Sequence, residues 1–392
     1  MAAAILFAQL ALAAGAPPTA WSGFVEAEYR AFTESALSPS QHGGYFSIAA
    51  QPEYYWKSAR GADSFTFVGF ARADRHDDER SHGDIRELTW LHVGEGFEAR
   101  AGVRKLFWGV TEAQHLVDVI NQTDFVEDIE SEDKLGQPML NLAFPYARGA
   151  FDIFILPGFR ERSFPGVEGR PRTELVVDTD RAQYASPRGR EHVDYAARLS
   201  HTIGAWDLGL SYFSGTNRDP RLLPAVTASG ALVLVPYYDQ MEQTGVDVQA
   251  TIGAWLWKLE TIYRAADSAP YAAASAGFEY TFTGAWAGKD LGVIVEYLWD
   301  ERQALAPTLF QDDVMLGLRL GFNDEHSSEA LLGVIADAGN HGRMFSAEAS
   351  RRVAEHWKIG AKAKIFDNIS PADPLYSFRN DDYLEITLGF YF

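Results

Sequence analysis

The sequence predicts an all-β protein, a closed antiparallel transmembrane β-barrel of about eighteen strands with one inward-folding loop. Many segments alternate apolar and polar residues with a period of two, and each run is about the 9 to 11 residues that a tilted membrane-spanning strand needs. The connections between these segments alternate between short and long. The last segment, "DDYLEITLGFYF", ends an apolar face on an aromatic residue. These three observations define the predicted class.

Composition excludes several alternatives. The chain has 54 acidic and 34 basic residues, a formal charge of -20, so it offers no basic field for nucleic acid. It contains no cysteine, which rules out disulfides and thiolate metal sites. Its 34 glycines and 13% aromatic residues are typical of a β-rich protein with many turns.

The N-terminus indicates export. The stretch "AILFAQLALAAGA" is a short apolar run that ends in small residues, as in a secretory signal peptide, although no Lys or Arg precedes it. We therefore predict a signal peptide over residues 1–16 and a barrel over residues 17–392. A buried N-terminal helix is the alternative.

The strands follow in order from Trp21. In each, one face is apolar and the other is charged or small, as the period of a strand requires. The clearest examples are "EHVDYAARLS", "AWLWKLETIYRA", "DLGVIVEYLW", "DVMLGLRLGF" and "HWKIGAKAKIF".

Short and long connections alternate along the chain. Turns such as "GEG", "PYAR" and the "GA" pairs near residues 204 and 253 alternate with long connections. Outer-membrane barrels have short periplasmic turns and long outer loops, whereas a soluble sandwich has no reason to sort loops in this way. The pattern therefore favours a barrel in the outer membrane of a Gram-negative bacterium. The long connections are predicted at 74–83, 109–136, 158–190, 216–236, 301–312 and 367–381.

The final strand should pair with the first, because an open sheet edge in hydrocarbon leaves unpaired backbone groups. Phe390 and Phe392 lie on its apolar face and resemble the C-terminal signal that the barrel assembly machinery reads in Gram-negative outer-membrane proteins.

If the apolar faces contact lipid, the alternate residues line the lumen. We count nine basic and eight acidic residues there, so neither sign dominates. These charges either pair across strands as a structural network or line a water-filled pore. Lys358, Lys362 and Lys364 form the densest basic cluster, which would favour anions. The residues predicted to line the pore are Arg100, Arg104, Arg198, Lys258, Glu260, Arg264, Lys358, Lys362 and Lys364.

The long connection after Arg104 is the most distinctive. Apolar residues in a loop need cover, so we expect residues 110–137 to fold into the barrel mouth as a constriction, with a short helix over 112–120. Six acidic residues follow between Asp124 and Asp133. They form a solvated loop face, a divalent-cation site or a charged ring at the pore.

Within this connection, "LFWG" followed by "DVINQTD" resembles a segment of alginate-export-type and related proteobacterial outer-membrane barrels. The resemblance implies an eighteen-stranded pore with a basic lumen for an anionic polymer. The chain departs from it in lacking a basic excess in the lumen and in having Gln122 where relatives often have Pro. The matching constriction-loop residues are Trp108, Asp118, Asn121 and Asp124, of which the last three are expected to hold the loop in place.

The predicted function is a porin-like channel for polar or anionic small solutes, with membrane lipid and lipopolysaccharide as further partners. One alternative is a closed barrel that anchors or docks a periplasmic or efflux partner, and another is a lipid-acting barrel enzyme. No catalytic or nucleotide-binding motif is present, so no enzyme activity or cofactor is predicted. His76 and His82 lie among acidic residues, yet their spacing fits no familiar metal motif, and no metal site is predicted.

Overall fold

The computed structural model describes residues 19–266, 269–303, 306 and 308–392, so the predicted signal peptide lies outside the described residues. Eighteen strands form one sheet. They are β1 (Thr19–Phe32), β2 (Gly44–Lys57), β3 (Asp63–Asp74), β4 (Gly83–Val93), β5 (Glu98–Arg104), β6 (Gln137–Tyr146), β7 (Gly149–Pro157), β9 (Val193–Ile203), β10 (Trp206–Thr216), β13 (Gln240–Ile252), β14 (Trp255–Ala266), β15 (Tyr271–Trp286), β16 (Lys289–Asp300), β17 (Asp312–Gly321), β18 (Glu329–Asp337), β19 (Arg343–Ala354), β20 (Trp357–Asp367) and β21 (Tyr383–Tyr391).

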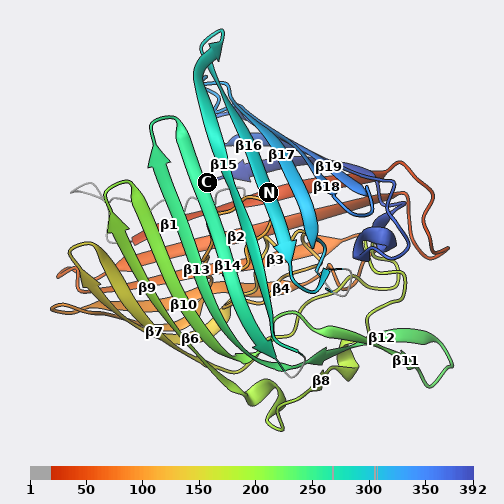
Figure 1. The fold of residues 1–392 in the computed structure, drawn as a ribbon, viewed down its shortest axis with the longest axis horizontal. Coiled ribbons are helices and arrows are strands. Elements are labelled where there is room, and N and C mark those ends of the chain that lie inside the picture. The colour runs from red at the N-terminus through yellow and green to blue at the C-terminus, as the bar shows by residue number, and fades with distance from the viewer. Residues whose placement is uncertain (1–18, 267–268, 304–305, 307) are drawn as a thin grey trace.

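The sheet closes on itself, which confirms the predicted barrel. Each strand pairs antiparallel with the next in the ring, and β1 pairs with β21 from Phe24 opposite Tyr391 to Phe32 opposite Tyr383. Across this seam, Arg30 Nη2 donates to Glu385 Oε2 at 2.7 Å. The barrel therefore has no free edge, as hydrocarbon requires (Figure 1).

The strands carry their apolar residues outward. On β21, Leu384, Ile386 and Leu388 are 48%, 40% and 43% exposed, whereas Tyr383 and Glu385 on the opposite face are buried. A globular protein in water would bury the leucines instead. An apolar outer wall around a polar interior is the arrangement of a transmembrane barrel. Among the described residues, no helix has the length and apolar character needed to cross a membrane.

The two ends of the barrel differ. At one end, hereafter the short-turn end, connections such as 204–205 and 253–254 are two residues long, and Gly204 and Gly253 adopt φ of 62° and 64° to turn the chain. At the other, the long-loop end, the connections include 33–43, 75–82, 105–136 and 158–192. The hairpin turns lie to the upper left in Figure 1 and the long connections to the lower right. The predicted sorting of loop lengths is present.

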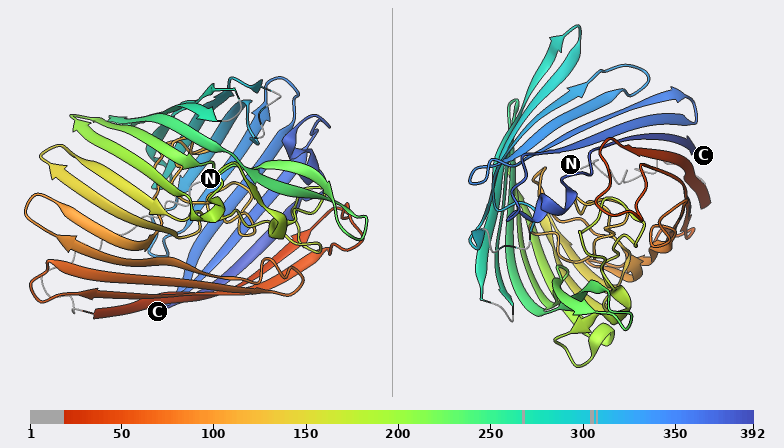
Figure 2. Two further views of the ribbon diagram at one scale, coloured as in Figure 1. Left: turned by 90° about the horizontal axis from the view of Figure 1, so that it is seen from below. Right: turned by 90° about the vertical axis from the view of Figure 1, so that its right-hand side faces the viewer.

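The long connections contain some regular structure. The connection predicted as a plain loop over 216–236 instead forms the hairpin of β11 (Arg221–Val226) and β12 (Leu232–Tyr238), and β8 (Gln183–Tyr184) pairs with β12. Its alternating Leu and Val residues favour pairing even outside the membrane. The connections also hold short 3₁₀ helices, η1 (Thr179–Arg181), η2 (Gly189–Glu191) and η4 (Pro374–Phe378). Figure 2 shows irregular chain enclosed by the ring of strands.

Candidate functional site

The segment 105–136 between β5 and β6, hereafter the inner loop, lies inside the barrel. Val117 and Ile120 are fully buried in a cluster with Phe213 of β10 and Ile262 of β14. Ile129, nearer the other end of the loop, packs in a second cluster with residues of β16 to β20. The loop therefore contacts widely separated parts of the wall and occupies the interior.

The residues of the alginate-export-like motif fasten the loop to itself. Asn121 Oδ1 accepts from the Leu106 N–H at 2.9 Å, and its Nδ2 donates to the carbonyls of Arg104 at 2.8 Å and Leu135 at 2.9 Å. One amide thus joins both stems of the loop. The Trp108 N–H donates to Asp118 Oδ1 at 3.2 Å. These residues lie where a loop-holding role needs them.

Asp124 fastens the loop to connections at the long-loop end and to the wall. Its Oδ2 accepts from Arg86 Nη2 at 2.5 Å and lies 3.1 Å from His82 Nε2, and its Oδ1 accepts from Ser163 Oγ at 2.6 Å. Burial alone would raise the pKa of Asp124, but the His82 hydrogen bond and the Arg86 charge hold it well below its usual range. The same contact raises the pKa of His82 against its own burial.

The His82 group also contains a second carboxylate, Glu127. One ligand atom from each of His82, Asp124 and Glu127 could face a metal ion, since these atoms lie within 4.8 Å of one another. Arg86 already bonds Asp124, and Arg72 bonds Glu127 through Nε at 2.9 and 3.0 Å. Guanidinium charges thus neutralise both carboxylates, so the group acts as a charge cluster that holds the loop.

Two wall carboxylates cradle the first half of the inner loop. Glu260 of β14 accepts from the N–H groups of Val110 at 2.7 Å, Thr111 at 3.0 Å and Val117 at 3.1 Å. Glu296 of β16 accepts from the N–H groups of Glu112 and Ala113. The helix expected over 112–120 is absent. In such a helix the Val117 N–H would bond the Ala113 carbonyl, and here it bonds Glu260 instead.

The acidic second half of the loop is not a solvated face. Asp128 and Glu130 are held against β20, where Lys364 Nζ lies 3.3 Å from Asp128 Oδ1 and 2.6 Å from Glu130 Oε2, and Lys362 also bonds Asp128. The loop acids therefore neutralise two of the three lysines predicted to attract anions. The third, Lys358, lies 3.7 Å from Glu329.

The same three lysines differ in their exposure to water. All three lie on one face of β20, and their side chains are 41%, 17% and 0% exposed in the order Lys358, Lys362 and Lys364. Exposure thus falls steadily from the short-turn end toward the inner loop. Water therefore reaches the inward face of β20 near the short-turn end and is excluded from it beside the inner loop.

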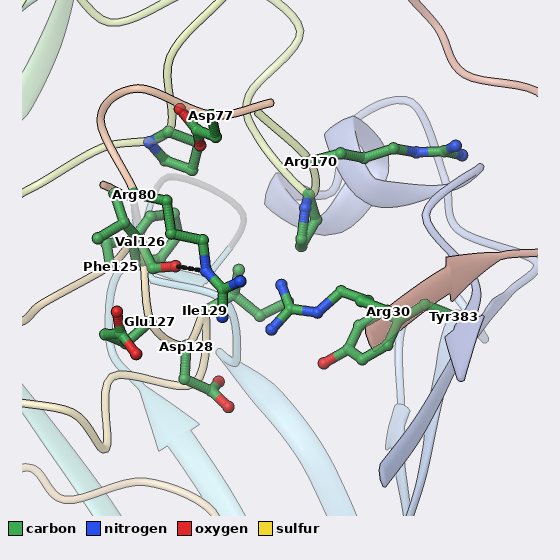
Figure 3. A pocket seen from close by; sticks show the side chains of 12 residues that line it. Arg30, Asp77, Arg80, Phe125, Val126, Glu127, Asp128, Ile129, Arg170 and Tyr383 are labelled. Carbon is green, nitrogen blue, oxygen red and sulfur yellow. Dashed lines mark hydrogen bonds between the residues drawn. The ribbon is translucent and has the colours of Figure 1, made fainter. Parts of the chain in front are cut away.

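A small cavity lies between the inner loop, β1, β21 and connections at the long-loop end. It encloses about 10 Å³, which is room for roughly one water molecule. In Figure 3 the guanidinium groups of Arg30 and Arg80 extend toward each other across it. Both arginines, and Arg72, contact the buried carboxylate of Glu28 at 2.8 to 3.5 Å. The charged residues that line the cavity are Arg30, Asp77, Arg80, Glu127, Asp128 and Arg170.

The remaining basic residues predicted to line the lumen also have polar partners, and all of them except Arg104 contact a carboxylate. Arg198 contacts Asp247 at 2.8 Å, Lys258 contacts Glu112 at 3.4 Å, and Arg264 contacts Asp219 at 3.0 Å. Arg100 and Arg104 both donate to Asn141 Oδ1, and Arg100 also bonds Glu98. Of the two roles considered for the lumen charges, a structural network of pairs is therefore present around much of the wall.

Sequence reasoning missed several contributors. Arg218 donates twice to the Ile120 carbonyl, at 3.1 and 3.0 Å, from a connection at the long-loop end. Strand alternation does identify part of the missed set, because Glu28 and Arg30 share the inward face of β1 and Arg72 and Arg86 lie on inward positions of β3 and β4. Their convergence on the inner loop carries no local sequence signal.

A closed eighteen-stranded barrel with a charged interior and a loop folded inside has the architecture of an outer-membrane porin. No family model and no curated protein matches the sequence. Solved structures do match the fold. A BenF-like porin from Pseudomonas fluorescens Pf-5 is 9% identical over 96% of this chain and 97% of its own, with a TM-score of 0.55. OccD3 (OpdP) of Pseudomonas aeruginosa is 8% identical over 95% and 91%, also at 0.55.

A third similar structure is Wzi of Escherichia coli, described as a carbohydrate-binding β-barrel of the outer membrane involved in group 1 capsule assembly. It is 9% identical over 93% of this chain and 84% of its own, with a TM-score of 0.52. At these identities the comparisons establish the porin-type fold alone. They do not single out the alginate-export type.

Proposed function

We propose that this protein is an outer-membrane channel through which small polar solutes, anionic ones included, pass. The fall in exposure along β20, from 41% at Lys358 to 0% at Lys364, carries the proposal. If paired charges filled the whole lumen, we would expect the inward lysines of β20 to be buried along the full length of the strand. In this proposal the exposed end of β20 lines a water-filled chamber, and the inner loop forms the constriction at its end.

The pairing of charges sets the expected selectivity. Three arginines and three acidic residues line the narrow cavity, so their formal charges cancel. The basic cluster predicted on β20 is neutralised in the same way by Asp128 and Glu130. We therefore propose selection by size more than by charge, with a weak preference between ions.

The proposal includes a location and an orientation. The apolar outer wall would contact outer-membrane lipid, the long-loop end would face outward beside lipopolysaccharide, and the short-turn end would face the periplasm. Phe390 and Phe392 would present the assembly signal. Phe392 lies at the closing seam, where its N–H donates to the Gly23 carbonyl at 3.1 Å.

Conductance of the refolded protein in a planar bilayer tests this function. We expect discrete conductance steps and a reversal potential close to zero under a salt gradient. A protein that folds as a barrel, shown by a gel mobility that changes on heating, but never conducts would refute the channel.

The inner loop fills the lumen toward the long-loop end, which favours a second candidate. This candidate is a closed barrel that anchors or docks a periplasmic or efflux partner. Its supporting observation is the fully buried Lys364, which ties the loop to the wall. Replacing residues 110–130 with a short glycine-serine linker separates the two. A channel should then conduct more, whereas a filled barrel should lose stability and stay closed.

A further inference from the structure

Three connections at the long-loop end bring two histidines and a glutamate together. His42 lies in the β1–β2 connection, His76 in the β3–β4 connection, and Glu168 in the β7–β9 connection. One ligand atom from each lies within 4.8 Å of the others. His42 Nε2 is 3.1 Å from Glu168 Oε2, and the two imidazole rings stack with centroids 3.8 Å apart. Residues 126 and 34 positions apart thus converge at one point.

The backbone around Glu168 is docked onto the His42 connection. Tyr45 Oη accepts from the His42 N–H at 3.0 Å, and the same hydroxyl donates to the Glu168 carbonyl. Gln41 Nε2 donates to the Gly169 carbonyl at 2.9 Å, and Arg170 Nη1 donates to the His42 carbonyl at 3.4 Å. These contacts hold two of the three residues in place without help from their side chains.

The third residue is positioned independently. Asp74 Oδ1 accepts from the His76 N–H at 2.9 Å, which turns the β3–β4 connection toward its neighbours. Asp77 Oδ1 then accepts from the Gly166 N–H at 3.0 Å and joins this connection to the one that carries Glu168. The three side chains are therefore presented by a preassembled backbone, so a bound ion would reorder little of it.

The donor set selects a class of ion. Two imidazole nitrogens and one carboxylate oxygen suit Zn²⁺ and its neighbours among the divalent transition metals, whereas Ca²⁺ and Mg²⁺ prefer oxygen donors alone. The side chains of His42 and Glu168 are 40% and 50% exposed, so an ion can reach them from the solvent. A fourth position would remain for water.

We propose that His42, His76 and Glu168 form a surface site for a Zn²⁺-class ion that staples three connections together across the long-loop end. This site differs from the buried His82 group, whose two carboxylates are already bonded by arginines. It is independent of the proposed channel function, since it requires only the folded barrel.

The test begins with the full-length protein, refolded in detergent and stripped with a chelator. Zn²⁺ is then titrated against a chromophoric competitor. We expect one ion bound per chain, with affinity at least about tenfold weaker in each of His42→Ala, His76→Ala and Glu168→Ala because each removes a direct ligand. His82→Gln and His326→Ala are the controls and should bind as the unaltered protein does. Unchanged affinity in the three site variants, or an equal loss in His82→Gln, would overturn the proposal.

A second measurement reports on the site directly. The chain contains no cysteine, so Glu168→Cys introduces a unique thiol beside the two histidines. Loaded with Co²⁺, this variant should show thiolate-to-cobalt charge-transfer absorption, and adding His42→Ala and His76→Ala should abolish it. Absence of that absorption in a folded Glu168→Cys protein would place the ion elsewhere and refute the site.

Discussion

Replacing Glu260 with glutamine should loosen the inner loop without opening the barrel. Oε1 of Glu260 accepts from the Val110 N–H, the Thr111 N–H and the Thr111 hydroxyl, at 2.7, 3.0 and 2.7 Å, while Oε2 accepts from the Val117 N–H at 3.1 Å. A glutamine keeps the shape but has one acceptor oxygen. Its NH₂ group must then face at least one buried N–H, and the negative charge that strengthens every bond is lost.

The size of the effect follows from these bonds. One buried donor left without an acceptor costs about 1–3 kcal/mol. A loss of about 2 kcal/mol would raise the population of released loop roughly 30-fold, since 1.4 kcal/mol is a factor of ten in an equilibrium constant. Glu260→Ala removes all acceptors and should release the loop further. The barrel itself should remain closed, because β14 keeps its backbone pairing with β13 and β15.

Two assays check this prediction. Limited proteolysis should cleave Glu260→Gln within residues 105–136 faster than the unaltered protein, and bilayer recordings should show larger or less stable conductance. Glu53→Gln is the matched control, because Glu53 lies on β2 and bonds Gln51 and Ser22 instead of the loop. If Glu260→Gln matched the unaltered protein in both proteolysis and conductance, the claim that Glu260 holds the inner loop in place would be refuted.

Three further predictions concern the loop and the chamber. Asp124, with its lowered pKa, stabilises the loop at any pH above about 4. The pKa of His82 is raised from its ordinary value of 6.5, so the stability that His82 adds is complete below pH 6.5 and is lost as the pH rises through the raised pKa. Protection of the loop from protease should therefore be greatest below about pH 6.5 and fall as the pH rises above it, and a pH-independent rate would contradict this. His82→Gln should show no such fall. In single-cysteine variants, Lys358→Cys should react with a charged thiol reagent much faster than Lys364→Cys, and equal rates would contradict the hydration gradient. Asn121→Leu should cost about 2–4 kcal/mol of loop stability, because it breaks three hydrogen bonds that join the stems, and unchanged proteolysis would rule out that role.

The sequence predicted the barrel well because the membrane imposes its pattern residue by residue. On β21 the outward Leu384, Ile386 and Leu388 alternate with inward positions, and lipid on one side and polar interior on the other make that alternation visible without any tertiary information. The same logic placed the short turns, since a two-residue turn such as 204–205 needs only a local signal.

The inner loop was predicted less completely because its conformation is fixed by distant residues. The apolar residues near Val117 did indicate a buried segment, but the helix expected there depended on local hydrogen bonds. Glu260, 143 residues away, takes the Val117 N–H, which such a helix would bond internally. No pattern within residues 105–136 reveals that competition.

The seam between β1 and β21 also sets an order of events during folding. The Arg30 and Glu385 side chains that bond across it are 355 residues apart in sequence, so this contact cannot form until nearly the whole chain has been delivered. Long-range pairing of this kind is slow, because the entropy of closing the intervening chain opposes it. Until the seam forms, both edges expose unpaired backbone and the inner loop has only part of its enclosure. Closing the ring therefore completes the membrane wall and the surroundings of the loop in a single late step.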